Sequence, residues 1–446
     1  MRHSVVELDK SYNDQSLTPT QAVEECLESI QELDPILGAW QEVYVEEARA
    51  AARIADTEVS SGRRKSPFHG VPFALKDIVE VEGKRTAAGC FEWKDRESTM
   101  TAEVATRLID AGGILLGKTK TVEFAMGGWG TNQRMGTPHN PWDKNVARTP
   151  GGSSSGSGVS VASGMVPCAI GTDTGGSVRL PAAFCGIAGL KTTEGLLPTS
   201  GIVPLSHTLD TPGPMARSIG DVAVMFEALL GRPTGVDLNA GVRGIRIGCL
   251  PDEERSGIEE AQLAAYDRSL DLLADLGAEI VQFKPPKPFE EMKVATFVIV
   301  TAEGYFHHQK IMDDPEALVD EHVRARFAPG ASISSSDYVG ALLERENDQQ
   351  KFFASIQHLD ALLTPTTPML PLALTEADEE STPARFTRAI NYLSMCATSV
   401  PSGVSKENLP TSLQIACRGG DENMSLRIAA AYEAVRGDLP DPALYN

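Results

Sequence analysis

Two clusters rich in glycine and serine lie close together near the middle of the chain. The first reads GGSSSGSG from Gly151, and the second reads GTDTGGSVR from Gly171. The segments between them, VSVASGM and VPCAIG, are typical of a helix and a buried strand, so a flexible linker is disfavoured. The clusters instead indicate rigid loops whose backbone amides can bind a negatively charged group.

The first cluster does not fit a phosphate-binding loop. Gly151 and Gly156 have the required spacing, but Ser157 stands where that motif needs a lysine. A nucleophile elbow, G-x-S-x-G, matches residues 152–156 with Ser154 at its centre. The elbow requires a preceding strand, and the preceding residues, DKNVARTP, are not apolar. The elbow therefore stays an alternative.

The second cluster has the composition of an acyl-transfer site. It follows an apolar strand predicted over 166–170, and its glycines allow a tight turn. The turn leaves the amides of Thr174, Gly175 and Gly176 free to form an oxyanion hole, directly before the hydroxyl of Ser177. A serine hydroxyl needs a base to become a good nucleophile. Because no histidine lies in this stretch, the base must come from elsewhere.

A lysine at the end of a short apolar strand is the candidate base. The strand predicted over 71–75 ends at Lys76. Most lysines are surface charges, but a lysine that leaves a strand end into a cleft can be desolvated, which lowers its pKa. Lys118 also follows a strand, yet it is not favoured as the base. Order and local context also disfavour His207 and Asp210, which a Ser-His-Asp mechanism would require.

Together these motifs resemble those of the amidase signature family, the Ser-Ser-Lys amidohydrolases. That family carries a GGSSSGS segment, then GTDTGGSxR, and an upstream lysine in a GxPxxxKD setting, which reads GVPFALKD from Gly70 here. The spacing between Ser153 and Ser177 also fits. Weaker features, including EFAMGG, HNPWD, LDTPGPMARS and LPTSLQI, extend the resemblance over most of the chain, with residues 252–357 the least diagnostic.

The resemblance implies a role for each motif residue. Ser177 is the nucleophile, and Ser153 bridges it to a neutral Lys76, which accepts the proton. Asp173 and Arg179 either support the nucleophile from behind or only fix the turn of the loop. The resemblance implies neither a metal ion nor an organic cofactor.

A long loop over 123–142, with few helix or strand signals, precedes the first serine cluster. Long loops in compact enzymes are often functional. Met126 and Trp129 are therefore candidates to line the substrate pocket, with ordinary packing as the equal alternative. Many relatives have Ser where Gly128 stands and no Trp after it, so an altered pocket is expected.

The resemblance implies an enzyme that cleaves the C–N bond of a small-molecule amide through a serine acyl-enzyme, releasing a carboxylate and an amine or ammonia. The alternative is the glutamine-hydrolysing component of an aminoacyl-tRNA amidotransferase, which passes ammonia to a partner. Leu180, where that component often has Gln, and the loop at 127–129 favour the free-standing amidase. A binding role without catalysis is disfavoured, because all three catalytic residue types are retained.

Composition excludes several other classes of function. Lys and Arg number 40 against 61 Asp and Glu, and the resulting net charge of −21 disfavours nucleic-acid and anionic-membrane partners. No run approaches the ~18 apolar residues of a membrane span, and no secretory signal is visible. Seven scattered cysteines without CxxC spacing indicate a reducing cytoplasm rather than a metal site. We therefore expect a cytoplasmic enzyme, with a homodimer left open.

The elements that position these motifs alternate between strand and helix along nearly the whole chain. This order predicts an α/β fold with a large mixed β-sheet sandwiched between helical layers. Because no linker divides the chain, we expect one domain over residues 1–446, with a helix-rich subregion over 252–357 that shapes one wall of the cleft. A capping box from Thr18 to Gln21 predicts the first clear helix, and the proline-rich segment 201–217 is expected to be irregular.

Overall fold

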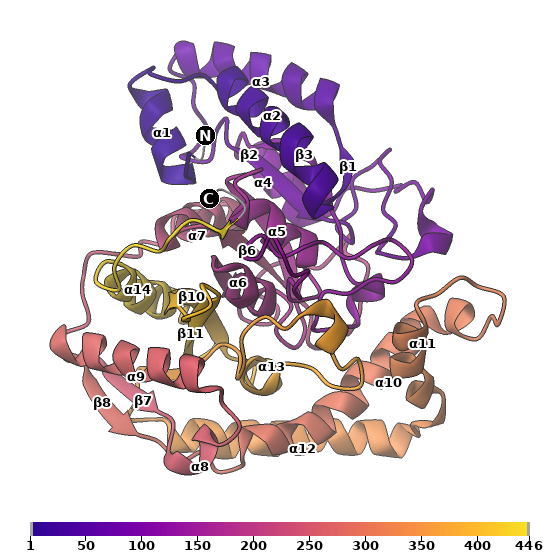
Figure 1. The fold of residues 1–446 in the computed structure, drawn as a ribbon, viewed down its shortest axis with the longest axis vertical. Helices are drawn as coiled ribbons and strands as arrows, with labels where there is room; N and C mark the ends of the chain where they lie inside the picture. Colours follow the sequence, from indigo (N-terminus) through magenta and orange to yellow (C-terminus); the bar gives the residue numbers. More distant parts are fainter. Residues whose placement is uncertain (1–2, 444–446) are drawn as a thin grey trace.

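One mixed β-sheet organises the protein, which we describe from a computed structural model over residues 3–443. Its strands are β1 (Trp40–Val43), β2 (Pro72–Lys76), β3 (Ile114–Thr119), β4 (Cys168–Asp173), β5 (Ala188–Lys191), β6 (Thr211–Ala216), β7 (Arg246–Cys249), β8 (Glu279–Gln282), β9 (Ala361–Pro365), β10 (Cys396–Val404) and β11 (Pro410–Cys417). The 11 strands lie in the order β1-β3-β2-β4-β6-β5-β10-β11-β9-β7-β8 (Figure 1). Parallel pairs join β2 to β3 and β4, and β7 to β8 and β9, whereas the remaining pairs are antiparallel.

Helices connect and cover the strands. They are α1 (Val5–Asn13), α2 (Pro19–Leu37), α3 (Val45–Ser60), α4 (Glu103–Asp110), α5 (Ser155–Ala162), α6 (Arg179–Cys185), α7 (Ile219–Leu230), α8 (Asp252–Arg255), α9 (Glu260–Asp275), α10 (Lys293–Met312), α11 (Glu321–Phe327), α12 (Ser335–Ser355), α13 (Arg385–Tyr392) and α14 (Glu422–Glu433). Within residues 3–443, no helix combines the length and the apolar character that crossing a membrane would require.

Alternating side chains of the central strands enter two separate cores, one on each face of the sheet. In β2, Phe73 and Leu75 pack into the core that contains Val222 of α7, whereas Ala74 packs into the core that contains Val159 of α5. This alternation is the period of two that a strand imposes on its side chains. It confirms the expected mixed sheet between helical layers.

Two local predictions had opposite outcomes. The capping box at the start of α2 is confirmed, since Thr18 and Gln21 each accept a hydrogen bond from the backbone N–H of the other. The expectation that 201–217 is irregular holds for 201–210 but is wrong for 211–216, because β6 lies there in the middle of the sheet. The prolines of β6 made a strand hard to predict, because proline has no N–H to donate to a neighbouring strand. Their carbonyls still accept hydrogen bonds, as that of Pro212 does from the Thr192 hydroxyl at 2.9 Å.

The tight packing of β6 gives a test of the fold. A Cβ atom at Gly213 would lie 2.1 Å from the Leu190 carbonyl oxygen, so Gly213→Ala should lower the free energy of unfolding by about 1–3 kcal/mol or more. Gly340 of α12 is the matched control: a Cβ atom there meets nothing within 4 Å, and Gly340→Ala should stabilise by about 0.4–1 kcal/mol. Denaturant midpoints that shift in the same direction for both variants would contradict this packing.

Candidate active site

Lys76 is the last residue of β2, and its side chain is completely buried. Its Nζ donates hydrogen bonds to Ser153 Oγ at 2.6 Å and to Thr172 Oγ1 at 2.8 Å. Burial lowers the pKa of Lys76 to about 7, although the negative charges of Asp210 and Asp173 act to raise it. A large fraction of the amine is therefore neutral near pH 7 and able to accept a proton.

Ser153 lies in the loop directly before α5 and is completely buried. Its carbonyl accepts hydrogen bonds from the Thr121 hydroxyl at 2.9 Å and from the Val122 amide at 3.2 Å. The residues after β3 therefore hold the serine loop against the end of β2, because β2 and β3 are parallel neighbours. This pairing brings Ser153 to the amine of Lys76, 77 residues earlier in the chain.

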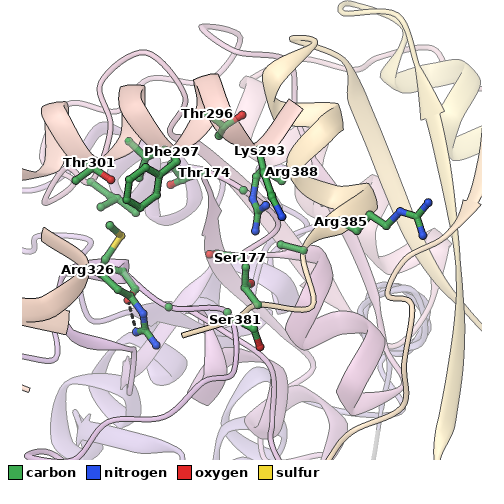
Figure 2. A pocket seen from close by; sticks show the side chains of 18 of the residues that line it. Thr174, Ser177, Lys293, Thr296, Phe297, Thr301, Arg326, Ser381, Arg385 and Arg388 are labelled. Atoms are coloured by element: carbon green, nitrogen blue, oxygen red, sulfur yellow. Dashed lines mark hydrogen bonds between the residues drawn. The ribbon is translucent and has the colours of Figure 1, made fainter. Parts of the chain in front are cut away.

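Ser177 lies in the turn between β4 and α6, and it borders a cavity of about 650 Å³ (Figure 2). The residue is 8% exposed, so its hydroxyl is protected but reachable from the cavity. The Ser154 amide donates to the Ser177 carbonyl at 3.3 Å, which joins the two serine loops. Within residues 3–443, no hydrogen bond directly connects the hydroxyls of Ser153 and Ser177.

The turn before Ser177 corrects one part of the predicted oxyanion hole. The Gly176 amide donates to Asp173 Oδ1 at 2.8 Å, so it is already engaged. Gly176 has φ 132°, and a Cβ atom there would lie 2.3 Å from Thr387 Oγ1, so only glycine fits this turn. In the described part of the chain, the amides of Thr174, Gly175 and Ser177 donate to no acceptor. Three amides around the turn are therefore available to a ligand.

Asp173 and Arg179 form a completely buried ion pair behind this turn. Arg179 Nε and Nη2 donate to the two carboxylate oxygens, both at 2.9 Å, and Nη1 donates to Gln414 in β11. Burial acts to raise the pKa of Asp173, but the charge and hydrogen bonds of Arg179 hold it at about 2. Asn391 of α13 also donates to Asp173, at 2.9 Å. The pair therefore fastens the turn to distant segments, and neither residue lines the cavity.

Two further residues lie near Lys76: Thr172, to which the sequence assigned no role, and Asp210, which was considered only as part of the disfavoured Ser-His-Asp mechanism. Thr172 is the second hydrogen-bond partner of the amine. Asp210 is partly buried, accepts from the Thr174 hydroxyl at 2.5 Å and from the Leu205 and Ser206 amides, and has its pKa raised by burial to about 6. Both residues lie inside motifs that were recognised, GTDTGGS and LDTPGPMARS, but their contacts could not be inferred from spacing.

The structure places the disfavoured alternatives away from the cavity. Ser154 is buried, and its hydroxyl donates to the Thr172 carbonyl and accepts from the Thr172 amide. Lys118 is buried too, but it donates to Thr86 Oγ1 at 2.9 Å and pairs with Asp77. The half-exposed His207 contacts a histidine and a glutamate on α10 and makes no hydrogen bond to Asp210 within residues 3–443.

The two pocket candidates have different positions. Met126 lines the cavity that borders Ser177. Trp129 does not: it is 2% exposed, stacks on Phe184 with ring centroids 6.3 Å apart, and donates from Nε1 to the carbonyls of Asp378 and Ser381. Ordinary packing therefore explains Trp129. Its indole holds the segment that contributes Ser381 to the cavity wall.

The helix-rich subregion supplies one wall of the cavity through α10. That wall is mainly apolar and comprises Lys293, Val294, Thr296, Phe297, Val298, Val300 and Thr301. The opposite side comes from the 125–128 loop and from Leu180 of α6. The cavity that borders Ser177 therefore offers a bound group mainly apolar surface to pack against.

Comparison with known proteins gives a consistent assignment. The amidase family model matches residues 21–426. The chain is 34% identical to 2-amino-5-chloromuconic acid deaminase of Comamonas testosteroni, over 94% of this chain and 93% of that protein. It is 33% identical to the A component of the glutamyl-tRNA(Gln) amidotransferase of Anaeromyxobacter dehalogenans, over 96% and 95% of the respective chains.

Solved structures agree in fold across almost the whole length. The peptide amidase of Stenotrophomonas maltophilia superposes with a TM-score of 0.87 at 27% identity, covering 99% of both chains. The A component of the glutamyl-tRNA(Gln) amidotransferase of Thermotoga maritima superposes with a TM-score of 0.81 at 30% identity, covering 96% of this chain and 95% of that one. The family expected from the motifs is confirmed: this chain belongs to the amidase family and is an amide-hydrolysing enzyme.

Proposed function

We propose that this chain is a free-standing amidohydrolase that cleaves a small-molecule amide through an acyl-enzyme on Ser177. The proposal depends on one observation above all: the buried amine of Lys76, with a pKa of about 7, lies 2.6 Å from the hydroxyl of Ser153. A lysine in water, with a pKa of about 10.4, would be almost entirely protonated at this pH. Here it can act as the base of a Ser-Ser-Lys triad.

The acylation step uses all three side chains. Ser177 Oγ attacks the carbonyl carbon of the amide and passes its proton to Ser153, which passes its own proton to neutral Lys76. Rotation of the Ser177 hydroxyl completes this relay when substrate fills the cavity, since catalytic hydrogen bonds often tighten only in the complex. The amides of Thr174 and Gly175, together with the Ser177 amide, stabilise the oxyanion, and each such donor typically contributes about 2.7–4 kcal/mol.

The same relay then works in reverse. Protonated Lys76 returns a proton through Ser153 to the leaving nitrogen as the C–N bond breaks, and the amine or ammonia departs. Water attacks the ester on Ser177, and Lys76 accepts the proton of that water through Ser153. Breakdown of the second tetrahedral intermediate releases the carboxylate and restores the hydroxyl of Ser177. The chemistry assigned here uses only groups of this chain, so we propose no metal or organic cofactor.

The second candidate is the glutamine-hydrolysing component of an aminoacyl-tRNA amidotransferase, which the 33% identical relative favours. Two observations support the free-standing enzyme instead. Leu180, which the resemblance marks as a departure from that component, lies in the cavity wall and so affects recognition of the substrate. The net charge of −21 also disfavours contact with tRNA.

We further propose one amidase domain over residues 1–446, because a single sheet includes strands from residue 40 to residue 417. Free thiols at all seven cysteines support a cytoplasmic location. The partners proposed are a small amide and, at most, a second copy of this chain.

The nucleophile can be identified by covalent capture. Ser177→Ala should abolish amide hydrolysis and labelling by a fluorophosphonate probe, because no other serine of the two described serine loops borders the cavity. Ser154→Ala is the matched control and should keep the label, since that hydroxyl bonds only to the Thr172 backbone. Mass mapping of the modified peptide decides, and a label on Ser154 would overturn the assignment.

The pH dependence identifies the base. The single-turnover acylation rate should rise with pH through a midpoint of about 7 and then level off, because only neutral Lys76 accepts a proton. Lys76→Ala and Lys76→Arg should both lower this rate by about 10²–10⁴-fold, since neither leaves a group that can act as base at this pH. His207→Ala should leave the rate unchanged.

Asp210→Asn tests whether the charge of Asp210 raises the pKa of Lys76, and so the pH midpoint of the acylation rate. Asparagine can keep the contacts to Thr174 and to the Ser206 amide but carries no negative charge, so the midpoint should move to lower pH. Asp275→Asn, on the exposed side of α9, should leave the midpoint in place. Near-normal acylation by Lys76→Ala, with its fold intact by circular dichroism, would exclude lysine as the base.

The two candidate functions differ in whether the purified chain is active without partner proteins. The purified chain should hydrolyse members of a panel of small amides without any added protein, because its catalytic groups all come from one chain. Product carboxylates measured by mass spectrometry provide the readout, and Ser177→Ala gives the background rate. Activity restricted to glutamine, and seen only with the other amidotransferase components present, would instead establish the second candidate.

A further inference from the structure

Four cationic side chains line the cavity that contains Ser177, and only one of them lacks an acidic partner within residues 3–443. Three are neutralised by carboxylates: Lys293 by Glu290 at 2.6 Å, Arg385 by Glu254 at 2.8 Å, and Arg326 by Glu379. Across the same described residues, the guanidinium of Arg388 makes neither a hydrogen bond nor an ion pair. Glu380 also lines the cavity, but within the described residues it pairs with none of the four cations. Arg388 is therefore the one cation of this cavity that no carboxylate contacts in the described part of the chain.

Helix α13, which carries Arg388, is fixed relative to the turn that holds Ser177. Its neighbour Thr387 donates to the Gly175 carbonyl at 2.9 Å, and Asn391 of the same helix donates to Asp173. The Arg388 Cγ atom lies 3.9 Å from where a Cβ atom of Gly175 would be. Figure 2 shows the Arg388 side chain directed toward Ser177. Because α13 is attached to the turn, the base of the Arg388 side chain has a defined place beside it, and its guanidinium can reach the cavity.

An uncompensated guanidinium at a partly buried position is costly unless a ligand supplies its partner. Burial lowers the pKa of Arg388, and the nearby charge of Glu290 acts in the opposite direction without forming an ion pair with it. Arginine stays charged at neutral pH and presents a planar fork of N–H donors that matches a carboxylate. A phosphate group carries close to two charges at pH 7 and would need a second free cation. One free guanidinium therefore favours a carboxylate.

We propose that the substrate of this enzyme is an amide that also carries a carboxylate, and that Arg388 binds that carboxylate. The inference rests on the proposed function, since it assigns the substrate class of the site at Ser177. Arg388 acts as a binding residue, and its interaction orients the amide carbonyl over the turn. Two positions are open to the carboxylate, on the acyl part or on the amine part of the substrate, and the test includes both.

The test compares amides that differ only in charge. Glutaramate against pentanamide places the carboxylate on the acyl side, and N-acetyl-β-alanine against N-propylacetamide places it on the amine side. In at least one pair, the wild-type enzyme should show a kcat/KM about 10–100-fold higher for the anionic member, the range expected for hydrogen bonds to a charged group. No preference for the anionic member in either pair would overturn the proposal.

Variants then attribute the preference to one side chain. Arg388→Met should remove the preference by lowering kcat/KM for the anionic amide about 10–100-fold while hydrolysis of the neutral amide continues, and Arg388→Lys should restore part of it. Arg385→Met is the matched control: it removes a cation of the same cavity that is already paired with Glu254 and that points away from Ser177 in Figure 2. The Arg385→Met variant should keep the preference for the anionic amide. Unchanged preference in Arg388→Met would assign the carboxylate to another group and so refute the proposal.

Binding without turnover separates this inference from the proposed function. Calorimetry on Ser177→Ala should show the anionic amide binding at least about ten-fold more tightly than its neutral analogue, and the difference should vanish in Ser177→Ala/Arg388→Met. Failure of the fluorophosphonate probe to label Ser177 would refute the nucleophile but not this binding preference. Equal binding of both amides, or binding of neither, would refute the carboxylate site while leaving the nucleophile intact.

Discussion

The removal of one primary amine from water is the constraint on which the site depends. At pH 7 a lysine with its pKa in water has roughly one neutral amine in 2,500, whereas the buried Lys76 has its pKa lowered to about 7. Its two hydrogen-bond partners are hydroxyls, which do not hold a positive charge as a carboxylate would. The nearby carboxylates of Asp173 and Asp210 are occupied by other donors. Desolvation therefore outweighs ion pairing at this amine.

The turn that carries Ser177 is held in the opposite way, by buried charges whose hydrogen-bond partners are all supplied. Asp173 and Arg179 bind each other, and side chains of Asn391 and Gln414, together with backbone groups that include the Gly176 amide, supply their further hydrogen bonds. Such a pair adds little net stability, because desolvation of both ions offsets their attraction. What it provides is geometry: it connects β4 and α6 to the late elements α13 and β11. The same attachment of α13 places Arg388 beside the turn.

The sequence by itself determined the parts of this protein that depend on neighbouring residues. The Gly/Ser clusters, the lysine at the end of β2 and the capping box of α2 are all patterns of consecutive residues. Alternation of strand and helix patterns was enough to predict the mixed sheet and its helical layers, because each element must bury one face. Three motifs in order also identified the family. None of these inferences needed the distance between remote residues.

The tertiary structure decided everything that depends on which remote groups meet. The central strand β6 was hidden by its prolines, and only pairing with β4 and β5 made it a strand. The sequence left Trp129 between pocket lining and ordinary packing, and its contacts with the 378–381 segment decide for packing. The Gly176 amide is engaged by Asp173. Arg388 has no partner among the described residues, whereas Glu290 and Glu254 pair with the other cations Lys293 and Arg385. A donor or a charge pairs with whichever of its spatial neighbours binds it best, and the folded chain decides which residues are neighbours.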